Sequence, residues 1–243
     1  MSLRPVLAVA GLALFSSAAS AQTIIHQYTF AGDASDSVGT ANGTLNGGAT
    51  ATGGVLSLDG TDDNVSFAQK IVPTSGAYSV AFFARQSSLQ GNFIEWISQG
   101  SSGAPGFYLG YAPGGGIRAT DSWGSTGVAF PANGQFQHIA LVSDGSASSL
   151  YLNGTLAGSI ASALSTTTGG DVTHFGKQFS PFDEFFKGEM KDMRIYTGAL
   201  SPQQVAALAS VATPEPGTVA LFTALSLSAV GFAKRRRRRN RQA

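Results

Sequence analysis

The stretch Leu150-Tyr151-Leu152-Asn153-Gly154-Thr155-Leu156-Ala157 decides the fold class of this chain. Two short β-type runs flank an Asn-Gly pair, and both turn residues tolerate positive φ, which makes this a strong signal for a tight β-hairpin. The run over 136–142 has a similar β-type character, and the run Tyr78–Arg85 is apolar on both faces. The run Tyr78–Arg85 is therefore expected in the interior of a sheet.

Further short β-type runs, separated by turn signals, fill the middle of the chain in the manner of a β-sandwich or barrel. We expect strands over 24–30, 55–58, 64–67, 93–98, 107–111, 117–120, 172–175 and 189–196. One short helix should follow, because Ser201 suits an N-cap, Pro202 suits the first helical position and Gln204 completes a capping box. At about two turns it is marginal alone, so it must pack on the sheets.

The charge of the body differs from that of the whole chain, whose formal net charge is +1. Basic residues concentrate at the two ends, and the body between them holds seven Lys/Arg against thirteen Asp/Glu, a net charge of −6. An acidic body argues against nucleic acid as a partner. Cysteine is absent, so neither disulfides nor thiolate metal sites contribute to the fold.

The N-terminus predicts export. Arg4 precedes an apolar stretch over 6–15 and the small residues Ala19-Ser20-Ala21, so we expect a signal peptide over 1–21. The alternative, a first transmembrane helix, is disfavoured because the apolar stretch is too short. The remaining length up to residue 210 suits a single domain, 22–210.

The C-terminus predicts a membrane anchor. A linker over 211–217 contains Pro214, Glu215 and Pro216, and an uncharged apolar run over 218–233 follows it. As a helix this run, with the glycine before it, spans roughly 25 Å, at the short end of what crosses a bilayer. The basic tail over 234–243 should stay cytoplasmic, and it begins with Lys234, Arg235, Arg236, Arg237, Arg238 and Arg239. A nucleic-acid arm is disfavoured because the charges directly follow the apolar run.

This order of Pro-Glu-Pro, apolar helix and arginine cluster resembles the PEP-CTERM sorting signal of Gram-negative bacteria. The resemblance implies inner-membrane anchoring, recognition by an exosortase-type processing enzyme, and delivery to the cell surface or extracellular matrix. It also implies an association with exopolysaccharide or biofilm.

The body resembles the bacterial laminin-G-like, concanavalin-type jelly roll. The matching segments, in chain order, are Tyr28-Thr29-Phe30, Asp36-Ser37-Val38-Gly39, Asn42-Gly43-Thr44-Leu45, 53–65, 78–85, 136–142, 150–154 and 188–196. Phe83 and Phe136 stand where the family often has Trp. The resemblance implies an all-β antiparallel sandwich followed by a short helix.

Calcium is the metal that the sequence favours, since the three histidines are scattered and oxygen ligands are abundant. In similar jelly rolls the segments of Asp36, Asn42 and Asp192 meet at strand ends and often hold a structural Ca²⁺. The open alternative is that these residues cap turns. The acidic stretch 59–64 lacks the glycine and glutamate of an EF-hand loop, and we interpret it as a hairpin turn rather than a calcium loop.

A non-catalytic role is expected. A retaining glycosidase needs two carboxylates about 5 Å apart, whereas Glu189 and Asp192 should point to opposite faces of one strand. Sugar-binding sites combine stacking aromatics with polar side chains, and the candidates here are Trp123, Tyr111, Arg118 and Asp121. Small and polar neighbours make Trp123 the residue most expected to be exposed.

The leading hypothesis is an exported surface or matrix protein that binds polysaccharide or a protein partner. The alternatives are a self-associating structural matrix protein and an envelope glycosidase or lyase.

Overall fold

The computed structural model of the chain describes residues 22–101, 106–166, 172–179 and 181–210. The predicted signal peptide, the Pro-Glu-Pro motif, the predicted spanning helix over 218–233 and the basic tail all lie outside these residues. Within the described ranges no helix combines the length and apolarity needed to cross a membrane.

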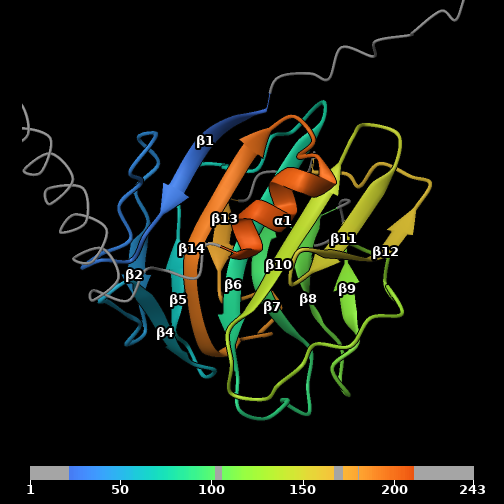
Figure 1. Cartoon of the computed structure of the whole chain (residues 1–243). Helices are drawn as coiled ribbons and strands as arrows, with labels where there is room; N and C mark the ends of the chain where they lie inside the picture. The colour runs from blue at the N-terminus through green and yellow to red at the C-terminus, as the bar shows by residue number, and fades with distance from the viewer. Residues whose placement is uncertain (1–21, 102–105, 167–171, 180, 211–243) are drawn as a thin grey trace, which may run out of the picture.

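The described residues form two antiparallel sheets and one short helix, which confirms the all-β sandwich (Figure 1). In order across the eight-stranded sheet lie β12 (Thr155–Ile160), β11 (Ser148–Leu152), β10 (Gln137–Ser143), β6 (Tyr78–Arg85), β14 (Lys187–Thr197), β4 (Val55–Asp59) and β3 (Thr50–Thr52), while β1 (Thr23–Tyr28) also pairs with β14. The six-stranded sheet consists of β2 (Thr44–Asn46), β5 (Asn64–Ser66), β13 (Thr173–Phe175), β7 (Ile94–Gln99), β8 (Phe107–Tyr111) and β9 (Ile117–Ala119). The predicted strands are all present within a few residues. Strands β2 and β3 were not expected, because three residues are too few to show an alternating pattern.

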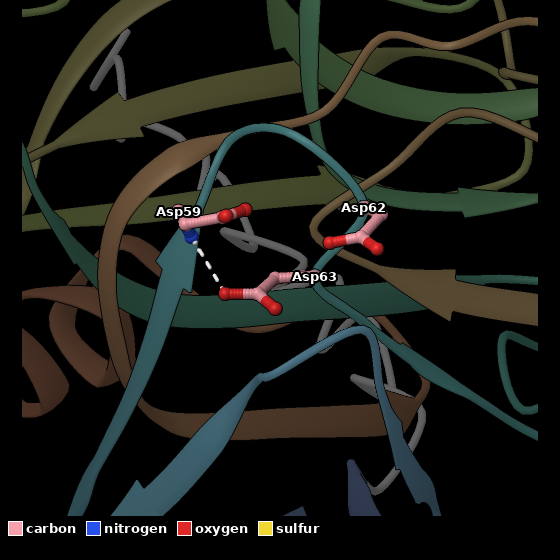
Figure 2. Close-up of side chains that lie close together, drawn as sticks. All are labelled: Asp59, Asp62 and Asp63. Carbon is pink, nitrogen blue, oxygen red and sulfur yellow. Dashed lines mark hydrogen bonds between the residues drawn. The ribbon is translucent and has the colours of Figure 1, made fainter.

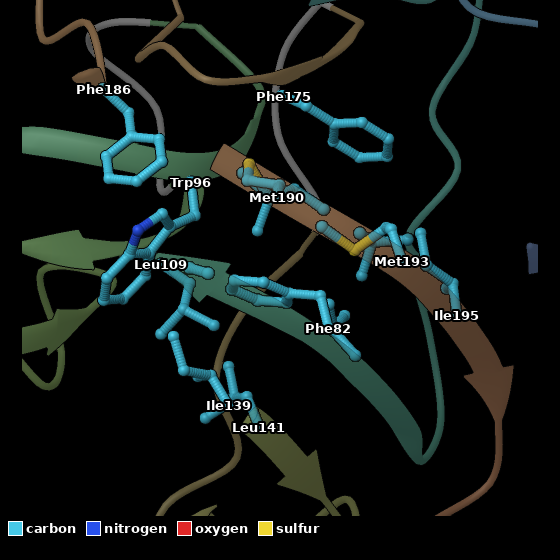
Figure 3. Close-up of a cluster of buried hydrophobic side chains, with 14 of the residues drawn as sticks. Phe82, Trp96, Leu109, Ile139, Leu141, Phe175, Phe186, Met190, Met193 and Ile195 are labelled. Carbon is cyan, nitrogen blue, oxygen red and sulfur yellow. The ribbon is translucent and has the colours of Figure 1, made fainter. Parts of the chain in front are cut away.

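Strand β6 lies between β10 and β14, as its two apolar faces predicted. Val80, Phe82 and Ala84 on one face belong to the main core between the sheets, whereas Ala81 on the other face belongs to a second core under the helix. The rings of Phe82 and Trp96 from β7 pack across the core with centroids 5.8 Å apart (Figure 3).

The predicted hairpin joins β11 to β12, with φ of 51° at Asn153 and 79° at Gly154. These left-handed values are the ones that a two-residue turn of type I′ requires and that Asn-Gly supplies at low cost.

Strand β14 contains a bulge that changes the direction of its side chains. Its register against β6 shifts between Lys191 and Arg194, and Asp192 has a φ of 50°. Met190 and Met193 both point into the core (Figure 3), whereas Glu189 and Asp192 both lie on the outer face of the sheet. The expectation that these two acids lie on opposite faces is therefore wrong, because a bulge breaks the two-residue period.

Helix α1 (Pro202–Ser210) covers part of this outer face (Figure 1). The predicted capping box is formed: Ser201 N donates to Gln204 Oε1 at 2.8 Å, and Gln204 N donates to Ser201 Oγ at 3.3 Å. Val205 is fully buried. Together with Leu200 it packs against side chains of β6, β10, β11 and β14. The helix is held by this packing, as its short length required.

Candidate functional site

A polar cavity of about 530 Å³ opens at one end of the eight-stranded sheet. Because neighbouring strands are antiparallel, the ends of β4 and β6 meet the starts of β10 and β14 at this place. The lining consists of Ser57 and Leu58, Arg85 with the loop 86–90, Gly134, and residues 187–189. Hydroxyl, amide and charged groups thus surround a space large enough for a small ligand.

The loop 86–90 is held in place by a hydrogen-bond network that runs from the core to the surface. Tyr111 donates through its hydroxyl to Gln86 Oε1 at 2.6 Å and accepts from Gln90 N at 3.0 Å. Gln90 Oε1 accepts from Gln86 Nε2 at 3.1 Å and from Lys187 N at 2.6 Å, which ties the loop to the start of β14. Burial raises the pKa of Tyr111, so this hydroxyl stays protonated and can donate.

Tyr111 itself is fully buried, which argues against the predicted contact with a ligand. It supports the cavity wall from inside the core instead.

Besides Lys187, the charged residues that line the cavity form a cross-strand pair. Arg85 of β6 lies opposite Glu189 of β14, and its Nη2 donates to Glu189 Oε2. Both side chains remain accessible, at 40% and 30% exposure. The guanidinium carbon of Arg85 also lies 4.5 Å from the ring centroid of Phe136. An ion pair and an aromatic face thus adjoin the open cavity.

Arg118, predicted to contact a ligand, forms a separate buried cluster on the six-stranded sheet. Its Nη2 lies 2.5 Å from Glu95 Oε1 and also bonds Glu184 Oε2. The guanidinium carbon lies 4.2 Å from the ring centroid of Phe93 and 4.7 Å from that of Tyr108. Burial, reinforced by Glu184 and opposed by Arg118, raises the pKa of Glu95 well above its usual value. Through these ion pairs the cluster links β7, β9 and the segment before β14.

Sequence reasoning missed Glu95, although a signal was present. A single carboxylate lies inside the apolar run Phe93-Ile94-Glu95-Trp96-Ile97, and a fully buried acid requires a partner. Gly110 of the neighbouring strand leaves the space for it, since a Cβ there would lie 2.2 Å from Glu95 Oε2 and 1.9 Å from Ile94 O.

Trp123 is buried, with 7% exposure, and the expectation that it is exposed is wrong. A tight turn with Thr120 at a φ of 57° brings Trp123 back against Ala119, and its side chain joins the main core. Asp121 is exposed and accepts a hydrogen bond from Tyr108 at 2.7 Å. Tyr108 therefore connects Asp121 to Arg118, but none of the four predicted ligand residues lines the cavity.

The carboxylate of Asp36 is surrounded by donors. Backbone N–H groups of residues 27, 38, 39 and 41 bond it at 3.0 to 3.2 Å, and His26 Nδ1 lies at 2.6 Å. Burial alone would raise the pKa of Asp36, but these hydrogen bonds outweigh it and lower the pKa to about 2. Asn42 Oδ1 accepts from Asp36 N at 3.0 Å.

Asp192 Oδ1 has other partners, Gln27 Nε2 at 2.9 Å and Arg194 Nε at 2.8 Å. The calcium site at Asp36, Asn42 and Asp192 stays a prediction, and this pattern of donors favours the alternative of turn caps.

The acidic stretch after β4 forms a turn, as expected, but β4 and β5 belong to different sheets, so it is not a hairpin (Figure 2). Asp59 N donates to Asp63 Oδ2 at 2.8 Å, and Thr61 N donates to Asp59 Oδ1 at 2.8 Å. Asp59, Asp62 and Asp63 each offer a carboxylate oxygen, and these oxygens all lie within 4.8 Å of one another. The group could hold a metal ion.

Comparison with solved structures finds similar folds. Domain 4 of AbnA, an extracellular arabinanase from Geobacillus stearothermophilus, was solved in complex with arabinotriose; it is 24% identical with a TM-score of 0.65 over 78% of this chain and 99% of that domain. The binding domain of botulinum neurotoxin serotype D is 15% identical with a TM-score of 0.57, and the match covers 78% of this chain and 52% of that one. The sialidase of Trypanosoma rangeli is 12% identical with a TM-score of 0.61, over 77% and 32%.

This chain thus spans about half of the neurotoxin domain and about a third of the sialidase. At these identities the likeness shows the fold alone. A search of curated protein sequences finds no match.

A comparison with protein families gives one match, over residues 59–206, to the family described as the concanavalin A-like lectin/glucanases superfamily. The matched region runs from the end of β4 into α1 and so includes most of both sheets. The chain belongs to the concanavalin A-like lectin/glucanase superfamily.

Proposed function

We propose that this chain is an exported, non-catalytic carbohydrate-binding protein and that the cavity at the end of the eight-stranded sheet is its binding site. The observation that carries the proposal is the preformed polar cavity in a domain of the lectin/glucanase superfamily. The arabinotriose bound by the AbnA domain supports carbohydrate as the ligand class.

The chemistry of the lining suits a ligand rich in hydroxyl groups. Ser87 and Ser88 are exposed at the cavity, and Arg85 and Glu189 offer charged hydrogen-bonding groups beside them. The loop that carries the serines is already fixed by Gln90, so binding would require little further ordering.

The arrangement of the carboxylates in the described residues supports a binding function rather than glycoside hydrolysis. Glu189 is the one acid among the lining residues, whereas glycoside hydrolysis ordinarily uses two carboxyl groups. The close pair Glu95 and Glu184 is joined through Arg118 and covered by aromatic rings, which leaves no room for a sugar between the two acids. The alternative of a glycosidase or lyase predicts release of reducing ends from polysaccharide and loss of that activity in Glu189→Gln.

A pull-down on polysaccharides tests binding, with the full-length chain solubilised in a non-ionic detergent. Ser88→Trp should fill the cavity and abolish retention, whereas Ser75→Trp, at an exposed position outside the lining, should leave retention unchanged. No retention of the unsubstituted chain on any polysaccharide of a broad panel, or equal retention of both variants, would refute the cavity as a glycan site.

Export and sorting are part of the same proposal. The signal peptide over 1–21 and the tail with Pro214, Glu215 and Pro216 support passage across the inner membrane and exosortase processing in a Gram-negative bacterium. The intact mass of the mature protein tests this: an N-terminus at Gln22 and a C-terminus near 214–216 are expected. An uncut chain in the cytosol would contradict it.

We also propose Ca²⁺ as the ion for the group of Asp59, Asp62 and Asp63. Carboxylate oxygens are hard ligands of the kind that calcium prefers, and an exported protein meets calcium outside the cell. Thermal unfolding in calcium and in EDTA tests the proposal, since equal melting temperatures in the two conditions would refute calcium binding by this group.

A further inference from the structure

Two basic side chains meet at one aromatic ring beside the cavity. The Arg85 guanidinium carbon lies 4.5 Å from the ring centroid of Phe136, and Lys191 Nζ lies 4.3 Å from the same centroid. The two charges are therefore no more than 8.8 Å apart, the sum of the two distances. Lys191 Nζ also lies 5.1 Å from the ring centroid of Phe83.

The fold brings these residues together from three strands. Lys187, Glu189 and Lys191 occupy every second position of β14 before its bulge and so lie on the same, outer face of the strand. Arg85 on β6 lies opposite Glu189. Phe136 directly precedes β10, which pairs with the other edge of β6. The basic pair thus adjoins the cavity, because Arg85 and Glu189 line it.

The local balance of charge is opposite to that of the whole body. Burial lowers the pKa of Lys191 and Arg85 lowers it further, although the neighbouring Asp192 opposes both. Glu189 is bonded to Arg85, and Asp192, which accepts hydrogen bonds from Gln27 and Arg194, interacts with Lys191. Arg85, Lys191 and Arg194 thus outnumber Glu189 and Asp192 on this part of the outer face. Two basic groups held within 8.8 Å of each other, on a body whose net charge is −6, favour the approach of an anion at this place.

We infer that Arg85 and Lys191 bind the carboxylate groups of an acidic polysaccharide whose chain continues into the cavity. Arg85 bonds Glu189 through Nη2, and a guanidinium has five N–H donors in a planar fork that matches a carboxylate. Phe136 holds the two cations beside the cavity through its ring. This inference rests on the proposed carbohydrate-binding function and names its ligand class as uronic-acid polymers.

Calorimetric titration of the full-length chain in non-ionic detergent tests the inference, with polygalacturonate fragments and the same fragments after reduction of their carboxyl groups. We expect the acidic form to bind at least tenfold more tightly than the reduced form. This preference should shrink as salt is raised from 50 to 500 mM, since salt screens exposed charges.

Charge-neutral variants locate the effect. Lys191→Gln should weaken binding of the acidic form about tenfold and leave the reduced form nearly unaffected. Arg85→Gln should weaken binding of both forms, and of the acidic form about tenfold more than of the reduced form, because Arg85 also lines the cavity. The matched control is Lys177→Gln, which removes a cation 5.1 Å from the ring centroid of Phe185, outside the cavity lining, and should change neither affinity. Melting curves identify a variant that fails to fold, and the other variant then decides.

The outcomes separate this inference from the function on which it rests. Equal affinity for the two forms, or an unchanged preference in both variants, would overturn the inference while carbohydrate binding stands. Binding of a neutral glycan with no binding of polygalacturonate would do the same. If no glycan binds, both the inference and the proposed carbohydrate-binding function are overturned.

Discussion

Acidification from pH 7 to pH 5 should destabilise the fold through one buried side chain, His138. It lies on β10 with 2% exposure, 5.0 Å from the Phe83 ring by centroid distance. Burial lowers its pKa from 6.5 to about 4. The unfolded state therefore takes up the proton first, so the contribution of this group to stability is complete above pH 6.5 and is lost as the pH falls towards 4.

The size of the effect follows from the shift. Each pH unit within this window costs about 1.4 kcal/mol, so the contribution of His138 to the free energy of unfolding should fall by about 2 kcal/mol at pH 5 and by about 3 kcal/mol near pH 4. Against a typical stability of about 5 to 15 kcal/mol, this loss is easily measured. Asp36 contributes at lower pH, because its pKa is lowered to about 2 and its stabilisation is lost only below about pH 4.

Urea denaturation of residues 22–210 at pH 7, 6 and 5 measures the effect. The control is His138→Gln, which keeps a polar side chain but cannot take up a proton; it should lose much less stability over the same range, whatever its stability at pH 7. Glu95 acts in the opposite direction in both proteins, because its raised pKa makes the fold more stable as the pH falls, so the His138 effect is read from the difference between them. An equal change in the wild type and the variant between pH 7 and 5 would refute the reasoning.

Three further outcomes are expected. Trp123→Ala should lower the free energy of unfolding by about 3 to 5 kcal/mol without changing polysaccharide retention, because the ring lies in the core; loss of retention at unchanged stability would contradict this. Gly110→Ala should prevent correct folding, judged by near-ultraviolet circular dichroism, since a Cβ would collide with Ile94 O and Glu95 Oε2; a native spectrum would show that β7 and β8 can move apart. Asp62→Asn should remove any rise in melting temperature produced by calcium while leaving the melting temperature in EDTA unchanged, because this carboxylate belongs to the three-acid group at the sheet-to-sheet turn; an undiminished calcium response would place the ion elsewhere.

Local signals in the sequence predicted much of the fold. The Asn153-Gly154 turn, the interior strand Tyr78–Arg85 and the capping box at Ser201 all formed as expected. Each depends on residues within a few positions of one another, through backbone conformation, side-chain period or a hydrogen bond between near neighbours. The family resemblance of the body is likewise confirmed over residues 59–206.

The candidate site depended on contacts that no local pattern records. Arg85 and Glu189 are 104 residues apart and meet because β6 pairs with β14 in one register. The bulge at Asp192 reversed the expected direction of that side chain, and a single turn moved Trp123 from the expected surface into the core.

The sequence by itself thus determined that this chain is a β-sandwich with a capped helix, because turn chemistry and apolar periodicity act over a few residues. Only the tertiary structure decided which polar groups share a cavity and which are buried. That outcome depends on how distant strands align, and a shift of one residue in strand register turns every side chain to the other face of the sheet.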